Sequence, residues 1–566
     1  MALWRRSAGR TRDVAAEMAA RAKADRLSSS LHTLWLLARQ GVVRPMRPDK
    51  LVRIVFAWRR WGVTPALGYA VAAIRHPDRP AVIDERGALS FLELDQRTTR
   101  LAKGLRARGI TDASRIAVLC RNHHGLVETI VACGKLGVDV VLLNTGLRPQ
   151  QVRTVLAEQQ ADLLVTDVEF TEELAEPDSA DPDLDVVLAW TEGTTRKATL
   201  EHLIGSSTAG SLPRRPRHSR LIVLTSGTTG TPKGARRPAP PGVGPAATIM
   251  SRMPLRAGER ILLAAPIFHT WGLAAFQLGS AIGATLVLRR KFEPQQALAA
   301  VQRHRATAMF MVPVMLQRIL DLPQEARAPY DTSSLRIVAA SGSALPADLA
   351  TRFQRVFGEV LYNFYGSTEA SWVSIANPRD LAESPGTAGR PPRGTSLKIL
   401  DEQGAQVRDG ETGRIFVSND MLFEGYTSGA GKEVRSGMLS TGDLGRIDEA
   451  GRLQVVGRED DMIVSGGENV YPKDTEDAIA TLPEVSEVAV IGVDDSDFGQ
   501  RLAAFVVLTE GAELDSDTVR ERVRPTLPKF ALPRDVTFLA ELPRNATGKV
   551  VPARLLEESE PTETER

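Results

Sequence analysis

Short apolar runs alternate with stretches of helical periodicity between about residue 80 and residue 340. Short apolar runs predict buried strands, whereas apolar positions three and four residues apart predict amphipathic helices. The predicted strands cover residues 115–120, 138–143, 221–225, 261–265, 284–288, 309–312 and 336–340, and the clearest helices cover 94–108 and 126–136. Such alternation is typical of an α/β fold with layered, largely parallel sheets.

The pattern changes near residue 458, where the predicted elements become shorter: strands over 488–493 and 503–508, and a helix over 516–527. A chain of 566 residues is too long for one hydrophobic core. We therefore expect a large domain over residues 65–457, a small domain over 458–556, and a polar, disordered tail over 557–566.

Residues 1–64 form a separate basic segment. Residues 1–61 contain 14 Lys/Arg and 4 Asp/Glu, together with four of the seven Trp. Over 51–61, helical spacing gathers the apolar residues and leaves Arg53, Ala57 and Arg60 on one narrow stripe. Two interpretations stay open: this helix packs on the protein, the commoner outcome, or residues 1–61 contact an anionic membrane surface peripherally.

Composition narrows the class of protein. Hydrophobic residues make up 43%, charged residues 25%, and the net charge is +2, which is typical of a globular protein and gives no reason to expect a nucleic-acid partner. The two cysteines, Cys120 and Cys133, lie in apolar stretches, so neither a disulfide framework nor a zinc site is expected. No secretory signal or membrane-spanning run is visible, and we expect a cytoplasmic protein.

A strand-like run leads into LTSGTTGTPKG over residues 224–234. The glycines allow backbone N–H groups to face an anion, and hydroxyls and a lysine add further donors. A polyphosphate site is favoured over a flexible linker because a strand precedes the loop and Lys233 lies within it. A Walker A loop does not fit, because Lys233 follows a proline and the next residues, 236–246, are too rich in Pro and Gly for a helix.

Four further motifs follow in order: YGSTE at 365–369, STGDL at 440–444, GREDD at 457–461 with GGENVYP at 466–472, and PRNATGK at 543–549. Together with the phosphate loop, they resemble the adenylate-forming superfamily of acyl-CoA synthetases, firefly luciferases and peptide-synthetase adenylation domains. Short stretches of sequence such as NTGL at 144–147 are most similar to actinobacterial fatty-acid–CoA ligases. The resemblance implies a large domain with a small β-subdomain and a mobile α+β C-terminal domain that rotates about Asp460.

The resemblance also implies roles for individual residues. The implied catalytic residues are Lys549, which joins the substrate carboxylate and the α-phosphate, Thr368, which contacts that phosphate, Glu369, which is the Mg²⁺ ligand, and His269 at the mouth of the acyl site. The implied positions for ATP and coenzyme A are Thr225, Ser226, Gly227, Thr228, Thr229, Gly230, Lys233, Gly342, Ser343, Asn363, Tyr365, Gly366, Asp443, Arg458, Gly466, Gly467 and Asn469. Without the resemblance, Glu369 and Lys549 are ordinary surface residues, Asp443 is an Asx-turn residue, and His269 is structural.

The implied reaction is ATP-dependent activation of a carboxylic acid to an acyl-adenylate, followed by transfer to coenzyme A. We expect a medium- or long-chain fatty acid, because Gly366 leaves the acyl pocket open and Ala274, Ala275, Val312 and Val314 nearby are small or aliphatic. An acyl-AMP ligase that loads a separate carrier protein is the alternative enzyme. A catalytically silent binding protein of the same fold is the alternative from a different class.

Overall fold

The computed structural model describes residues 31–171, 185–206, 210–225, 233–238, 240, 242–427, 429, 431–465, 468–495, 499–545 and 548–559. Within these ranges the side chains of residues 225, 233, 464, 465, 468, 469, 499, 558 and 559 are not described. Parts of two expected binding loops, 226–232 and 466–467, therefore lie outside the described residues.

The first sheet consists of β1 Pro80–Asp84, β2 Gly87–Ser90, β9 Arg260–Leu263, β10 Thr285–Leu288, β11 Ala308–Met311, β12 Ile337–Ala340, β13 Leu361–Tyr365 and β14 Ser374–Ala376. Their order across the sheet is β14-β13-β12-β11-β9-β10-β1-β2. The strands from β13 to β1 run parallel, and β14 and β2 pair antiparallel at the two edges.

The second sheet consists of β3 Arg115–Leu119, β4 Asp139–Leu142, β5 Leu163–Asp167, β6 Asp185–Trp190, β7 Leu221–Thr225 and β8 Lys233–Arg236. The order is β6-β5-β3-β4-β7-β8, and all pairs are parallel except β7 with β8. The two sheets confirm the predicted α/β class with largely parallel strands.

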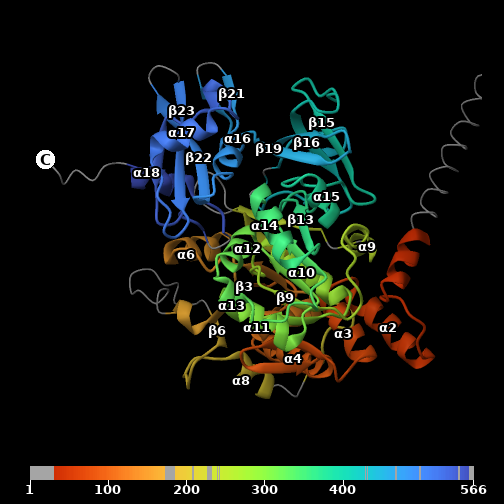
Figure 1. Cartoon of the computed structure of the whole chain (residues 1–566). Coiled ribbons are helices and arrows are strands. Elements are labelled where there is room, and N and C mark those ends of the chain that lie inside the picture. Colours follow the sequence, from red (N-terminus) through yellow and green to blue (C-terminus); the bar gives the residue numbers. More distant parts are fainter. Residues whose placement is uncertain are drawn as a thin grey trace, which may run out of the picture.

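Two smaller sheets follow in the chain. The third contains the antiparallel strands β15 Ser396–Leu400, β16 Gly413–Ser418, β17 Val434–Arg435, β18 Met438–Ile447 and β19 Leu453–Arg458. The fourth contains β20 Ile463–Ser465, β21 Glu468–Val470, β22 Val485–Asp495, β23 Gly499–Leu508 and β24 Asp535–Phe538. Arg458 therefore closes the third sheet, and the small domain starts just after it. Figure 1 shows the fourth sheet (blue) beside the third (teal to cyan), with α2 (red) elsewhere at the edge of the molecule.

The helices cover the faces of these sheets. They are α2 Pro48–Trp61, α3 Pro65–Arg75, α4 Phe91–Ala107, α5 His124–Leu136, α6 Pro149–Glu158, α8 Leu200–Ser206, α9 Gly244–Met250, α10 Thr270–Ala281, α11 Pro294–His304, α12 Pro313–Leu320, α13 Gln324–Arg327, α14 Ala347–Phe357, α15 Pro378–Glu383, α16 Pro472–Ile479, α17 Ser516–Val523 and α18 Pro552–Ser559. Short 3₁₀ turns lie at Val168–Phe170 and Lys529–Ala531. A further helix spans residues 31–39 of the described chain.

Two sequence expectations were wrong at element ends. Helix α9 begins at Gly244, inside the 236–246 stretch expected to be non-helical. The start is tolerated because Pro245 falls in the first turn, where its missing N–H has no intrahelical partner to lose. Helix α18 continues to Ser559, into the segment expected to be disordered.

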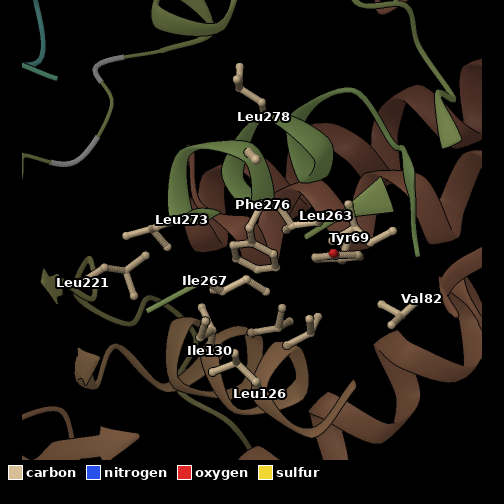
Figure 2. Packing of buried hydrophobic residues seen from close by; sticks show 14 of the residues in the cluster. Tyr69, Val82, Leu126, Ile130, Leu221, Leu263, Ile267, Leu273, Phe276 and Leu278 are labelled. Carbon is tan, nitrogen blue, oxygen red and sulfur yellow. The ribbon is translucent and has the colours of Figure 1, made fainter. Parts of the chain in front are cut away.

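One continuous core joins the two parallel sheets. Helices α3, α4, α5 and α10 contact one another or the sheet strands between them. Figure 2 shows Tyr69 of α3 and Phe276 of α10 facing Ile130 and Leu126 of α5. Tyr69 and Phe276 have ring centroids 6.1 Å apart, and both are fully buried. This packing fixes α10, which carries part of the site described next.

Candidate functional site

The sequence-predicted residues meet at the carboxyl end of the first sheet. Gly342 and Ser343 follow β12, Asn363 and Tyr365 end β13, and His269 follows β9. Loops after neighbouring parallel strands emerge at the same edge, which is where α/β sheets place ligands. All of these residues line one cavity of about 1840 Å³.

Lys549 reaches this cavity from the small domain. Its side chain projects into the open volume, so it retains exposed surface although protein groups surround it. Burial lowers the pKa of Lys549 from its usual value, as does the charge of Arg458, while Asp443 and Glu369 act in the opposite direction. The structure therefore brings together Glu369, Asp443 and Lys549, although 74 positions separate the first two in sequence and 106 the last two.

His269 also faces this group. It precedes α10 directly, as the residue before Thr270. Burial lowers the pKa of His269 to about 4, and the positive charge of Lys549 adds to the effect. A neutral imidazole is thus held beside the lysine at physiological pH.

Asp443 lies in the β18 strand opposite Arg458 of β19. The phenol of Tyr365 donates a hydrogen bond to Asp443 Oδ2, and Arg458 Nε lies 3.8 Å from Asp443 Oδ1. Burial raises the pKa of the Asp443 carboxyl, against the pull of its hydrogen bond and of Arg458. The Asx-turn interpretation of Asp443 is therefore incomplete, because the side chain faces the cavity and the aromatic residue expected to hold adenine.

Glu369 is buried at the cavity wall and accepts a 2.5 Å hydrogen bond at Oε1 from Tyr426. Thr368, its neighbour, shares a 2.7 Å hydrogen bond with Thr270 Oγ1. A carboxylate at the wall of this cavity offers the hard oxygen donor that Mg²⁺ prefers. The residues present therefore fit the expected metal.

Asn363 is buried in β13, and its Nδ2 donates a 2.9 Å hydrogen bond to the carbonyl of Thr387. The bond fixes the orientation of the amide at the cavity wall. Gly342 has φ of +103°, a conformation that favours glycine, and an added Cβ would lie 3.3 Å from Val312 Cγ1. The backbone next to Ser343 is thereby kept close to the expected adenine position.

Several expected contacts cannot be placed. Ser226, Gly227, Thr228, Thr229, Gly230, Gly466 and Gly467 lie outside the described residues. The backbone of Thr225 pairs with that of Lys233 where β7 and β8 meet, and Asn469 lies in β21, but these three side chains are not described. Lys233 opens a strand instead of a helix, which agrees with the rejection of a Walker A loop.

Sequence reasoning missed Arg237. It lines the cavity near Glu369, and its Nη2 donates a 2.7 Å hydrogen bond to Ser371 Oγ. Burial lowers the pKa of Arg237 to about 10, offset in part by Glu369. Its Nη1 is buried without a hydrogen-bond partner among the residues that the structure describes. The sequence could have indicated Arg237, because this cation follows the phosphate loop by only a few residues.

Tyr426, Thr270 and Lys432 were missed as well. The hydroxyl of Tyr426 and that of Thr270 hold Glu369 and Thr368, as described above, and Lys432 Nζ donates to the Thr441 carbonyl at 2.7 Å. Tyrosine, threonine and lysine are common on any surface, so no local pattern distinguished them.

Gly366 lines the cavity, and the structure adds a second reason for glycine at this position. A Cβ at this position would lie 2.2 Å from the Ser371 carbonyl oxygen and 3.1 Å from Trp372 Cα. Glycine is required by this close backbone approach, and not simply because a larger side chain would close the pocket. Of the four small residues expected at the pocket, Ala274 and Val314 line the cavity, whereas Ala275 and Val312 are buried in the core.

A second group of titratable side chains lies away from the cavity, at β3 and β5. Cys120, His123 and Asp167 are buried, with ligand-type atoms within 4.8 Å of one another. His123 Nε2 lies 2.7 Å from Asp167 Oδ1, and its Nδ1 accepts a 3.1 Å bond from the Gly125 amide. Both ring nitrogens are therefore engaged in structural hydrogen bonds. Cys120 and Cys133 are free thiols.

Two stacked parallel sheets, a small α+β domain that places a lysine in the shared cavity, and a Tyr–Asp–Arg group define a nucleotide-dependent ligase. The chain belongs to the AMP-binding enzyme family: the family model matches residues 69–427, and the model of the family's C-terminal domain matches residues 474–549. The adenylate-forming assignment is confirmed, and with it the expected use of ATP, Mg²⁺ and coenzyme A.

The chain is similar to curated enzymes. It is 34% identical over 481 residues to the feruloyl-CoA synthase of Amycolatopsis sp., covering 84% of this chain and 95% of that protein. It is 33% identical over 486 residues to the indoleacetate–CoA ligase of Aromatoleum aromaticum, covering 84% and 93%. These relatives are not fatty-acid enzymes by name, so the expected fatty acid is not confirmed.

Solved structures agree with this family. The o-succinylbenzoate CoA synthetase of Bacillus subtilis, in complex with its acyl-adenylate, is 27% identical with a TM-score of 0.74, covering 86% of this chain and 97% of that chain. The amide bond synthetase McbA of Marinactinospora thermotolerans is 27% identical with a TM-score of 0.77, covering 87% and 99%.

Proposed function

We propose that this protein is an AMP-forming acid–CoA ligase whose substrate is a hydrophobic carboxylic acid with a medium or long aliphatic chain. Family membership supports the ATP-dependent chemistry. The cavity supports the choice of acid, because it continues far beyond the residues around Lys549. The choice of an aliphatic chain rests on this extent of the cavity alone.

In the proposed first half-reaction, the substrate carboxylate attacks the α-phosphorus of ATP and pyrophosphate leaves. Two anions must approach, and negative charge builds on the phosphoryl oxygens. The ammonium of Lys549 offsets both effects, because it is positioned in the cavity before the reaction begins. Mg²⁺, when bound at Glu369, supplies further positive charge to the phosphates. Asp443 accepts hydrogen bonds from the ribose hydroxyls. The hydrogen bond from Tyr365 holds the Asp443 carboxylate in place.

In the proposed second half-reaction, the thiol of coenzyme A attacks the acyl carbonyl and AMP leaves. No nucleophile from the protein is required, so catalysis rests on positioning and charge. Rotation of the small domain about Asp460 would remove Lys549 and bring the side of that domain that carries Asn469 to the thiol channel. The described structure, with Lys549 in the cavity, matches the arrangement needed for the first step.

The acyl part of the cavity follows one face of α10. Thr270, Ala274, Gln277 and Ala281 line it at successive helical turns. At 1.5 Å per residue, this face extends roughly 16 Å away from Thr270. Each CH₂ group buried along it adds about 0.8 kcal/mol of binding free energy. A long chain would use the whole face, whereas a single aromatic ring would fill only its beginning.

Chain-length profiles of two plug variants test the substrate. We expect wild-type kcat/KM to rise steeply from acetate to at least an eight-carbon acid. Ala274→Trp should move the optimum to shorter chains, and Ala281→Trp should affect the longest chains alone. A wild-type preference for ferulate or indoleacetate over every aliphatic acid would show that the substrate is an aryl acid like those of the relatives.

The acyl acceptor is tested separately. A solved relative is an amide bond synthetase by name, and an acyl-AMP ligase that loads a carrier protein remains the alternative. We expect acyl-CoA from coenzyme A, and no comparable product from an acyl carrier protein or from simple amines. A failure with coenzyme A, together with normal ATP–pyrophosphate exchange, would refute the acceptor and leave the adenylation step intact.

A further inference from the structure

Helix α2 is exposed on its apolar side. Leu51, Val52, Val55, Phe56 and Trp58 are 51%, 54%, 41%, 67% and 54% exposed, and Ala57 is the buried residue of the helix. An amphipathic helix normally turns its apolar stripe toward the core. In α2 most of these apolar side chains point outward, and the side that packs on the protein carries Ile54, Ala57 and Trp61. Figure 1 shows α2 at the edge of the molecule.

The orientation of α2 is fixed by polar contacts on its other side. Arg60 donates a 3.1 Å hydrogen bond to the Pro213 carbonyl, and Lys50 donates a 3.2 Å bond to the Arg75 carbonyl at the end of α3. Gly62 lies so close to His218 that an added Cβ would be 2.0 Å from its ring. The helix is therefore held against the protein with its apolar face outward.

The preceding segment extends the same kind of surface. Leu31, Leu34, Trp35 and Val43 are also exposed. The chain over 31–61 contains seven Lys/Arg and one Asp/Glu. Exposed apolar and aromatic side chains interleaved with cations fit an anionic lipid surface: the apolar groups enter the interface, and the cations attract the headgroups. Among the described residues, no helix is long and apolar enough to cross a bilayer.

The cavity reaches this surface. Leu51 and Trp58, which are exposed on α2, line the same cavity as Ala281 at the far end of α10 and Lys549 at the reaction centre. Val43, also exposed, contributes to this wall. One continuous volume thus connects the outward apolar face with the site of acid activation.

We propose that the exposed face of residues 31–61 docks on an anionic phospholipid bilayer and that the hydrophobic acid enters the cavity from that bilayer. The docking surface stands on the exposure and charge of the segment. The entry route rests in addition on the proposed function. The substrate carboxylate leads toward Lys549 while its chain stays along α10 and α2.

Vesicle flotation tests the docking surface, and two variants are matched with controls. Val52 and Phe56 are exposed and do not line the cavity, so Val52→Glu/Phe56→Glu changes the surface alone. Val356→Glu is its control, because Val356 is 49% exposed on α14. Arg53→Glu/Arg59→Glu tests the charges, with Lys398→Glu as the control for an exposed cation elsewhere.

We expect wild type and both controls to float with vesicles of phosphatidylglycerol and phosphatidylcholine and to bind pure phosphatidylcholine far less. The apolar pair should lose flotation, and the charge pair should bind about fivefold more weakly for each cation removed. Equal flotation of the apolar-pair variant and wild type would overturn the docking surface. A second outcome would also overturn it: wild type fails to float but forms a concentration-dependent dimer, seen by light scattering, and the apolar-pair variant abolishes that dimer.

Turnover assays separate the entry route from the proposed function. With a short, water-soluble acid, the apolar-pair variant should keep wild-type kcat and KM. With a long-chain acid supplied in the vesicles, its rate should fall at least tenfold. Equal rates of the variant and wild type on vesicle-borne acid would overturn the entry route. Inactivity of wild type on every aliphatic acid would instead refute the proposed substrate, and flotation would still report on the surface.

Discussion

Charge is concentrated on a few residues at the reaction centre. Lys549, Arg237 and Arg458 face Glu369 and Asp443 around a single cavity. Burial shifts the pKa of Lys549 downward and that of Asp443 upward, so each charged form depends on the other charges and on bound phosphates. Small changes at any of these residues should therefore have large, step-specific effects.

Lys549→Ala should disable the first half-reaction selectively. Removing one positioned charge of this kind lowers the rate by about 10²–10³. Thioester formation from pre-made acyl-adenylate should survive, because the proposed rotation takes Lys549 out of the cavity for that step. ATP–pyrophosphate exchange and adenylate consumption measure the two steps separately, and an equal loss in both would exclude this role.

The pH dependence of adenylation should report the lowered pKa of Lys549. A lysine with a lowered pKa becomes neutral at a lower pH than usual, so kcat/KM for ATP in the exchange reaction should decrease as pH rises through that pKa. Lys549→Arg should move this alkaline decrease to higher pH, since arginine stays protonated. The same decrease in both proteins would assign it to another group.

Arg237→Met should weaken adenylation through lost anion binding. Its Nη1 is buried without a partner among the described residues, and Arg237 lines the cavity, so we infer that Nη1 donates to a phosphate or carboxylate oxygen of the substrates. We expect kcat/KM to decrease by about 10²–10³. Arg237→Lys should restore part of the activity, because it returns the charge without the second donor. Unchanged kinetics in the Met variant would indicate that Arg237 serves only to hold Ser371.

Residue roles were only partly predictable. Ordered motifs identified Glu369, Asp443 and Lys549 because those side chains occur in recognisable local strings. Arg237 and Tyr426 act through contacts with residues more than fifty positions away, which no local string records. Gly366 was expected at the pocket wall and does line the cavity, but the sequence did not reveal that the Ser371 carbonyl oxygen occupies the space where a Cβ would lie.

At the scale of elements, the turn before Lys549 determines where its charge lies. Gly548 has φ of +82°, and an added Cβ would be 2.9 Å from Val314 Cγ1. Gly548→Ala should displace Lys549 and lower ATP–pyrophosphate exchange by about tenfold or more, since small misplacements are costly in positioned sites. Gly511→Ala is the control: its φ is +79° and nothing lies within 4 Å. Equal effects of both substitutions would mean that backbone strain alone is responsible.

Strands and helices were predicted best where apolar periodicity was strong. The strand 221–225 matches β7, and the helix 126–136 lies within α5. Ends were predicted less well because they depend on particular capping contacts. Helix α4 begins at Phe91, before the expected 94, because Ser90 and Glu93 form a capping box. The outward face of α2 was not predictable, since periodicity gives the stripe but not the side on which neighbours lie.

At the scale of the whole molecule, the turn after β19 connects the two domains between which the proposed rotation takes place. Asp460 lies between the third and fourth sheets. Asp460→Pro fixes φ at this position and restricts the residue before it. We expect thioesterification to be impaired far more than adenylation, because Lys549 already occupies the cavity. Wild-type rates for both half-reactions would place the pivot elsewhere.

Val314 touches both functions of the molecule: it lines the acyl cavity, and it supports the turn that ends in Lys549. An acyl chain bound beside Val314 should therefore influence how rigidly the Lys549 ammonium is positioned. We therefore expect little idle turnover, in which ATP would be split with water as the acceptor while the cavity is empty. Leakage of AMP and pyrophosphate without acid should be slow in wild type and slower still in Val314→Ala, because this variant loses the contact that supports the turn before Lys549.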